Sequence, residues 1–305
     1  AVRDCSGGRQ HGRHVEHLTA ADGLVAPRFA QHESIPRQER ERIDQVQPSV
    51  ESLEEVSVQT SAFAAEYGQV AGGMFNLVAR SGTNQFHGSV FGRYQNQDLV
   101  GTDVNGLKSA DFKVLQYGGT LGGAIIQDKL QYFFAADISE RTTPFDGITL
   151  EESGAAPGDA ERMIDHLNTL GADQWGGAGS AGGFTIENPN PTYFGKLTWA
   201  PAANHNVALS YNNVGASVDV LSRRQNGDWQ LTSGAYSIEN QTNSLRLSWN
   251  AVFGGKYSNE FIGGLQTIRD NRPPNTTYPT VLVRSGTTGT QLVAGAERFS
   301  QDNSL

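Results

Sequence analysis

Alternation of apolar and polar residues over segments about ten residues long is the feature that most constrains this fold. Between residues 129 and 140, apolar residues occupy every second position from Leu130 to Ile138. The segments 86–96 and 242–253 alternate in the same way. Because successive residues of a strand point to opposite faces, each segment predicts a strand with one apolar and one mostly polar side.

Seven segments in all carry this pattern, so we expect about seven antiparallel strands. They lie at 86–96, 114–125, 129–140, 192–201, 204–214, 242–253 and 256–271. The connections alternate between short turns and long loops, a pattern typical of a transmembrane β-barrel. The short ones fall at 127–128, 202–203 and 254–255, and the long ones at 97–113, 143–190 and 215–235.

One helix is expected inside the longest loop, at residues 158–171. Its apolar residues Met163, Ile164, Leu167 and Leu170 recur at helical spacing, and Gly171 can end the helix. Aromatic residues in or near the strands, such as Trp199, Trp249 and Tyr257, would be core in a soluble sandwich. In a barrel some of them would lie at the membrane interfaces.

Composition excludes several classes of protein. No run of about 18 apolar residues exists, so no transmembrane helix is expected. The net charge of −9 disfavours a broad nucleic-acid surface, which needs clustered Lys and Arg. The single cysteine, Cys5, rules out an intrachain disulfide.

No motif predicts catalysis, a cofactor or a metal. GAGSAG at 177–182 matches a dinucleotide fingerprint but lacks the preceding strand and following helix, so we interpret it as a flexible loop. Cys5 with His11, His14 and His17 stands in a polar leader, and DVNGLKSAD at 103–111 has its Gly misplaced for a calcium loop. His87 falls on the polar side of its strand and is expected to line a barrel interior.

Residues 49–99 resemble the plug–barrel junction of TonB-dependent outer-membrane receptors, in the Oar-like branch. The likeness includes Glu66-Tyr67-Gly68, and 117–137 and 296–305 continue it, with Ala124 where the family usually has proline. Glycines at such a joint permit positive φ and close backbone approach. The junction residues, to which we assign a structural role, are Gly72, Gly73, Asn76, Ser81, Gly82, Thr83, Asn84, Phe86, His87 and Gly88.

The resemblance implies an all-β fold: part of an antiparallel transmembrane β-barrel of about seven strands, the C-terminal part of a plug, and one short loop helix. We expect a disordered leader at 1–48, the plug end at 49–84 and the N-terminal part of the barrel at 85–305. Family barrels have about 22 strands, so the chain is expected to be a fragment that neither closes a barrel nor transports alone.

The function implied is that of a receptor in the bacterial outer membrane. It would bind a ligand at the outer face and move it across the membrane with energy from the TonB complex. Ligand and ligand-binding residues stay unknown, and membrane lipid is the other expected partner. The alternative is a soluble or surface-associated β-sheet protein for adhesion or carbohydrate binding, and an enzyme is not expected.

Overall fold

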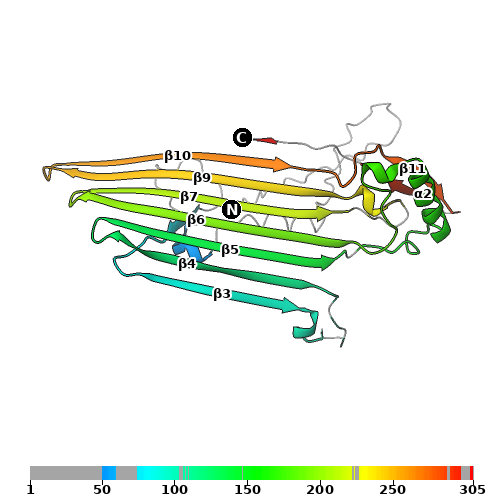
Figure 1. Cartoon of the computed structure of the whole chain (residues 1–305), viewed down its shortest axis with the longest axis horizontal. Helices are drawn as coiled ribbons and strands as arrows, with labels where there is room; N and C mark the ends of the chain where they lie inside the picture. Colours follow the sequence, from blue (N-terminus) through cyan, green and yellow to red (C-terminus); the bar gives the residue numbers. More distant parts are fainter. Residues whose placement is uncertain are drawn as a thin grey trace, which may run out of the picture. The chain divides into compact units, whose positions relative to one another are not determined.

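The computed structural model describes residues 50–59, 74–102, 106, 108, 110–145, 147–221, 223, 227–286, 289–296 and 303–304. Its main feature is an antiparallel sheet with the strand order β13-β10-β9-β7-β6-β5-β4-β3 (Figure 1). Seven strands are long, and β13 (Asn303–Ser304) has two residues. The long ones are β3 (His87–Asn96), β4 (Lys113–Ile126), β5 (Leu130–Pro144), β6 (Thr185–Ala202), β7 (His205–Val220), β9 (Tyr236–Phe253) and β10 (Tyr257–Asn271). Each has its counterpart among the seven predicted segments, which confirms the fold class.

Strand β6 begins seven residues earlier than predicted, and its prolines explain the difference. Pro189 and Pro191 interrupt the sequence pattern, yet they pair with Glu140 and Ile138 of β5. Pairing of β6 with β7 begins only at Thr192. The prolines therefore occupy a stretch where β6 has one neighbour, and a missing backbone N–H is tolerated on such an edge.

The cross-strand register separates the sheet into two faces, which we call the apolar face and the polar face. A single row across β5, β6, β7 and β9 joins Tyr132, Leu197, Leu209 and Leu247. The apolar face carries large side chains that remain solvent-exposed in the isolated chain: Val90, Tyr94, Tyr117, Leu121, Phe134, Tyr193, Leu197, Trp199, Leu209, Tyr211, Leu245, Leu247, Trp249, Tyr257, Phe261 and Leu265. The polar face includes Gln116, Asp137, Lys196, Ser210 and Arg246.

The two ends of the sheet differ in their connections. Turns at 127–129, 203–204 and 254–256 join the strands at one end, where Asp128, Gly254 and Gly255 have positive φ. At the other end the strands continue into long segments. Among the described residues, no helix is long and apolar enough to cross a membrane.

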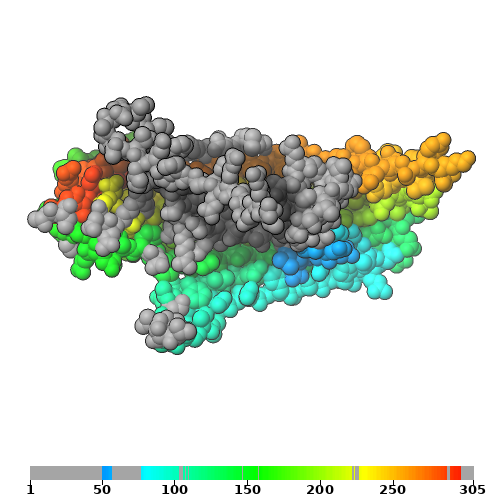
Figure 2. Space-filling model, turned by 180° about the vertical axis from the view of Figure 1, so that it is seen from behind, coloured from blue at the N-terminus to red at the C-terminus, as the bar shows by residue number. Residues whose placement is uncertain are grey.

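A separate strand pair contacts the polar face. It consists of β1 (Leu53–Gln59) and β2 (Met74–Ala79), preceded by the short helix η1 (Val50–Ser52). Ala79 packs against a small buried cluster of Phe133, Ala135 and Phe194 from β5 and β6. Figure 2, seen from behind, shows β1 in blue beside the sheet.

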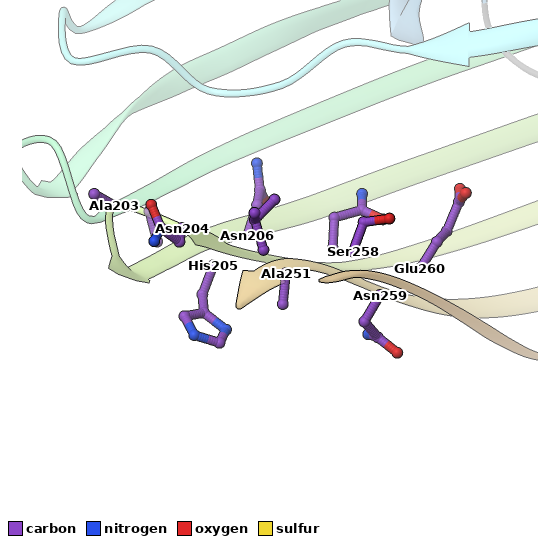
Figure 3. Close-up of a pocket in the computed structure, with 11 residues that line it drawn as sticks. Ala203, Asn204, His205, Asn206, Ala251, Ser258, Asn259 and Glu260 are labelled. Atoms are coloured by element: carbon purple, nitrogen blue, oxygen red, sulfur yellow. The ribbon is translucent and has the colours of Figure 1, made fainter. Parts of the chain in front are cut away.

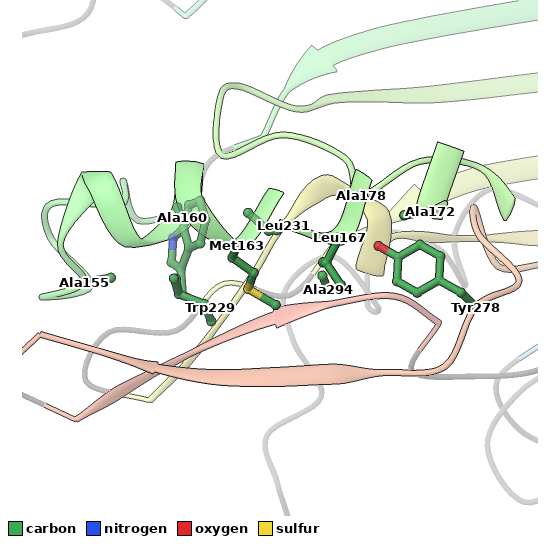
Figure 4. Packing of buried hydrophobic residues seen from close by; sticks show 11 residues of the cluster. Ala155, Ala160, Met163, Leu167, Ala172, Ala178, Trp229, Leu231, Tyr278 and Ala294 are labelled. Carbon is green, nitrogen blue, oxygen red and sulfur yellow. The ribbon is translucent and has the colours of Figure 1, made fainter. Parts of the chain in front are cut away.

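The β5–β6 connection, the β7–β9 connection and the segment after β10 fold together into a compact module, which we call the external cap (Figure 4). It contains α2 (Pro157–Thr169), η4 (Ala172–Trp175), η5 (Thr232–Gly234) and a sheet ordered β11-β12-β8. These strands are β8 (Asp228–Gln230), β11 (Val281–Ser285) and β12 (Thr290–Ala294), and β8 runs parallel to β12. The helix was predicted within two residues at each end, whereas the three short strands were not predicted. A further short helix, η3 (Gln97–Leu99), follows β3.

Candidate functional site

The segment between β2 and β3 is fastened to the sheet by Asn84. Its side-chain amide donates to Asp128 Oδ1 at 2.5 Å, and its Oδ1 accepts from the Asp128 backbone N at 2.8 Å and from Gln131 Nε2 at 3.3 Å. Asp128 lies in the β4–β5 turn. The joint between the strand pair and the sheet is therefore held at the short-turn end.

Gly82 shows why this joint requires glycine. A Cβ at this position would lie 2.2 Å from the carbonyl oxygen of Tyr132, so the junction backbone touches the backbone of β5. Gly88 is similarly close to β4, because its Cβ would lie 2.6 Å from the oxygen of Thr120. Any side chain at either position would push the two backbones apart.

The other predicted junction residues divide into described and undescribed ones. His87 pairs with Gly122 on the polar face, as expected, and its Nδ1 lies 3.0 Å from the Gln85 carbonyl and 3.3 Å from Thr83 Oγ1. Ser81 is half-buried and Phe86 is exposed. Asn76 belongs to β2, with its side chain outside the described atoms, and Gly72 and Gly73 lie outside the described residues.

The strand pair is joined to the polar face by Lys196, whose Nζ donates to the Ala79 carbonyl at 3.1 Å. Arg80, the next residue, returns two bonds to the start of β1: its backbone N donates to the Ser52 carbonyl and its Nε to the Leu53 carbonyl. Apolar packing of Ala79 against Phe133 and Phe194 surrounds the lysine contact. The polar face of the sheet thus holds the β1–β2 pair through the Lys196 hydrogen bond and the packing of Ala79.

The external cap is anchored by Asp159 in the first turn of α2. Its carboxylate accepts hydrogen bonds from Ser285 Oγ at 2.6 Å and from the Gly286 N–H at 3.2 Å, and it also contacts Arg162. These bonds join the helix to the β11–β12 hairpin. They stabilise the charged carboxylate, so the pKa of Asp159 lies below its ordinary value, with the Ser285 bond as the largest cause.

This anchor predicts a pH dependence of the cap. Because the pKa of Asp159 is lowered on folding, its stabilising contribution is complete above the ordinary carboxyl pKa and is lost as pH falls through the lowered one. We expect faster hydrogen exchange of the Gly286 amide below that pH. Asp159→Asn should show fast exchange at all pH values, and Asp165→Asn on the exposed side of α2 should behave as wild type. Wild-type-like protection in Asp159→Asn would contradict the anchor.

Arg223 connects three segments of the external cap. Its guanidinium lies 4.3 Å from the ring centre of Trp229 and 5.5 Å from that of Phe145. It also donates to the carbonyls of Gln230 and Gly182.

Partial burial lowers the pKa of Arg223 from its ordinary value. Burial raises the pKa of the Tyr278 phenol in the same core.

The GAGSAG segment (177–182) packs within the external cap. Ala178 is buried, and the Ser180 N–H donates to Thr232 Oγ1 at 2.7 Å. A strand follows it in place of a helix, so it is a packed loop. Among the described residues no group of three His, Cys, Asp or Glu could hold a metal ion. The leader with Cys5 and its three histidines, and most of 103–111, lie outside the described residues.

An open depression lies at the short-turn end of β7, β9 and β10 (Figure 3). His205, Ala251 and Asn259 point to one side of the ribbon there, and Asn206 and Glu260 to the other. It therefore spans the rim of the sheet and does not enter a core. On the apolar side, His205 packs against the rings of Trp249 and Phe253.

Comparison with known proteins connects this arrangement to transport. Residues 78–162 match the family described as "Outer membrane beta barrel domain". The TonB-dependent transporter Oar of Myxococcus xanthus is 28% identical over 235 residues, which cover 68% of this chain and 21% of that protein. The chain is similar to the Oar-like TonB-dependent transporters of the outer membrane. It spans about a fifth of the length of the curated relative that it matches.

The fold agrees with this similarity. The outer membrane transporter YddB of Escherichia coli superposes with a TM-score of 0.58 at 13% identity, over 84% of this chain and 31% of that one. These relatives are transporters and not enzymes. An outer-membrane barrel also explains the apolar face, because a soluble sheet protein would not expose so many large apolar side chains on one side.

Proposed function

We propose that this transporter binds a ligand outside the cell and moves it across the outer membrane with energy supplied through TonB. In this proposal η1, β1 and β2 are the end of the plug (residues 49–84), and 85–305 are barrel wall with its external cap. The plug is the part that must move, and the polar face is the wall along which the ligand passes.

One observation carries the proposal. The strand pair β1–β2 is held on the polar face of the sheet, and the opposite face of the sheet is apolar and suited to contact with lipid. Among the described residues, the contact includes the Lys196 bond to Ala79 and packing of Ala79 on Phe133, Ala135 and Phe194. Non-covalent contacts of this kind can be released and re-formed, as transport requires. The chemistry of the ligand is not specified by these residues.

Release of this contact can be measured through a thiol placed beneath the strand pair. In the full-length protein with Cys5→Ser, Phe194→Cys would place a thiol under Ala79, where the native ring is 6% exposed. We expect a membrane-impermeant maleimide to label it slowly in cells lacking TonB and faster in energised cells with TonB. Tyr193→Cys, the neighbouring position on the apolar face, should stay unlabelled in both. Equal labelling of Phe194→Cys with and without TonB would contradict plug movement.

A further inference from the structure

A second depression lies at the long-loop end of β3, β4, β5 and β6, and all its strand residues are on the apolar face. It has a volume of about 450 Å³, and its lining includes Tyr94, Asn96, Asp111, Lys113, Thr142 and Thr185. Asn96, Lys113 and Thr142 form one row across three strands, in register with Tyr94 two residues further inward. The depression therefore opens away from the strand pair and the polar face.

Its height on the wall places it at the external boundary of the membrane. Along β3 and β4 the apolar face carries Val90, Tyr94 and Tyr117, and the next row outward begins with Asn96 and Lys113. Short turns of such barrels face the periplasm and long loops face outward. The change from apolar to polar side chains thus marks the level of the outer-leaflet headgroups.

The chemistry of the lining suits a sugar better than a simple ion. Asn96, Gln97 and two threonines offer donors and acceptors for hydroxyl groups, and Tyr94 and Phe112 offer aromatic surface. Asp111 beside Lys113 would repel a bare anion, but together the two can accept and donate hydrogen bonds to a saccharide. No ion pair engages Lys113 among the described residues, so its ammonium can reach a ligand.

We propose that this depression binds the saccharide headgroup of an outer-leaflet glycolipid. The lipid origin follows from continuity: the sugar site joins directly onto the exposed apolar surface of Tyr94, Tyr117 and Val90, where acyl chains would lie. A soluble sugar has no acyl chains, so it would gain no binding energy from that apolar surface. The site is separate from the transport path, so it does not depend on the proposed transport function.

The test measures glycolipid retained by the full-length protein after purification from outer membranes and reconstitution in phospholipid nanodiscs. Intact lipopolysaccharide is the probe, and its deacylated, water-soluble core saccharide is the second arm. We expect Lys113→Ala combined with Thr142→Val to weaken lipopolysaccharide binding about tenfold, because a hydrogen bond to a charged group is lost. Lys256→Ala, an exposed lysine at the short-turn end, is the matched control and should bind as wild type.

Two outcomes would overturn the proposal. Unchanged lipopolysaccharide binding by the double variant would show that the depression is not the site. Equally tight binding of the deacylated saccharide would show that the ligand is a free sugar and not a lipid headgroup. Heat-modifiable migration of each variant confirms that the barrel has folded, so a loss of binding reports on the site.

Discussion

Replacing Trp229 by alanine is expected to unfold the external cap while the barrel wall stays folded. The Trp229 ring is fully buried, and its Nε1 donates to the Ile148 carbonyl at 3.4 Å. The Arg223 guanidinium lies over the face of this ring. Truncation of a buried tryptophan costs about 3–5 kcal/mol. The cap core is small, and Trp229 is its largest member, so a loss of this size should exceed what the cap can sustain.

Limited proteolysis of intact cells measures this effect, because the cap is outside the membrane in the proposed orientation. We expect Trp229→Ala to be cut within the cap segments much faster than wild type, with heat-modifiable migration of the barrel retained. Trp175→Ala is the matched control, since that ring is 57% exposed on the same cap and its loss removes little packing. Equal cleavage of the two variants would show that Trp229 does not hold the cap together.

Most of the barrel wall could be predicted from the sequence because its physical cause is local. A strand with lipid on one side and a polar interior on the other must alternate, and each of the seven strands does so over most of its length. The turns were equally visible, since residues 127–129, 203–204 and 254–256 are short and polar or glycine-containing. The prolines of β6 interrupt the alternation in its first part, so this part was not predicted as strand. They are tolerated because β6 has no β7 partner along that stretch.

The external cap could not be predicted beyond its helix. β8 has three residues, and β11 and β12 have five each, too few for alternation to be recognised. β8 pairs in parallel with β12, which lies more than 60 residues away in sequence, and β11 pairs with β12 as a local hairpin. Such strands are stabilised by burial of side chains such as the paired Trp229 and Leu292 in the core of the cap, and not by a pattern of their own.

The contacts of the candidate site were only partly visible in the sequence. The plug–barrel junction at Ser81–Gly88 stays a prediction from the resemblance, and within this stretch the structure shows close backbone contact at Gly82 and hydrogen bonds between Asn84 and Asp128. The Lys196 contact with Ala79 was not predicted, because an alternating strand shows only that Lys196 is on the polar side. Its partner is 117 residues away in sequence and is a backbone carbonyl, which no sequence motif records.

An arginine on the apolar face should prevent normal assembly of the barrel, and Leu247→Arg tests this most directly. Leu247 lies within the apolar stretch of β9, in a row with Leu209 of β7 and Gly263 of β10. A charged side chain facing lipid near the bilayer midplane costs about 2–4 kcal/mol in such barrels. We expect less heat-modifiable protein in the outer membrane and a lower denaturant midpoint in lipid vesicles.

The neighbouring residues supply the control, because β9 already contains an arginine one position earlier. Arg246 pairs with Ser210 on the polar face, so the chain tolerates this side chain when it points the other way. Ser248→Arg places a second arginine on that same face and should leave assembly close to wild type, apart from modest repulsion with Arg246. If Leu247→Arg and Ser248→Arg assembled equally well, the two faces would not differ in their contact with lipid. The apolar face could then not be the membrane surface of the barrel.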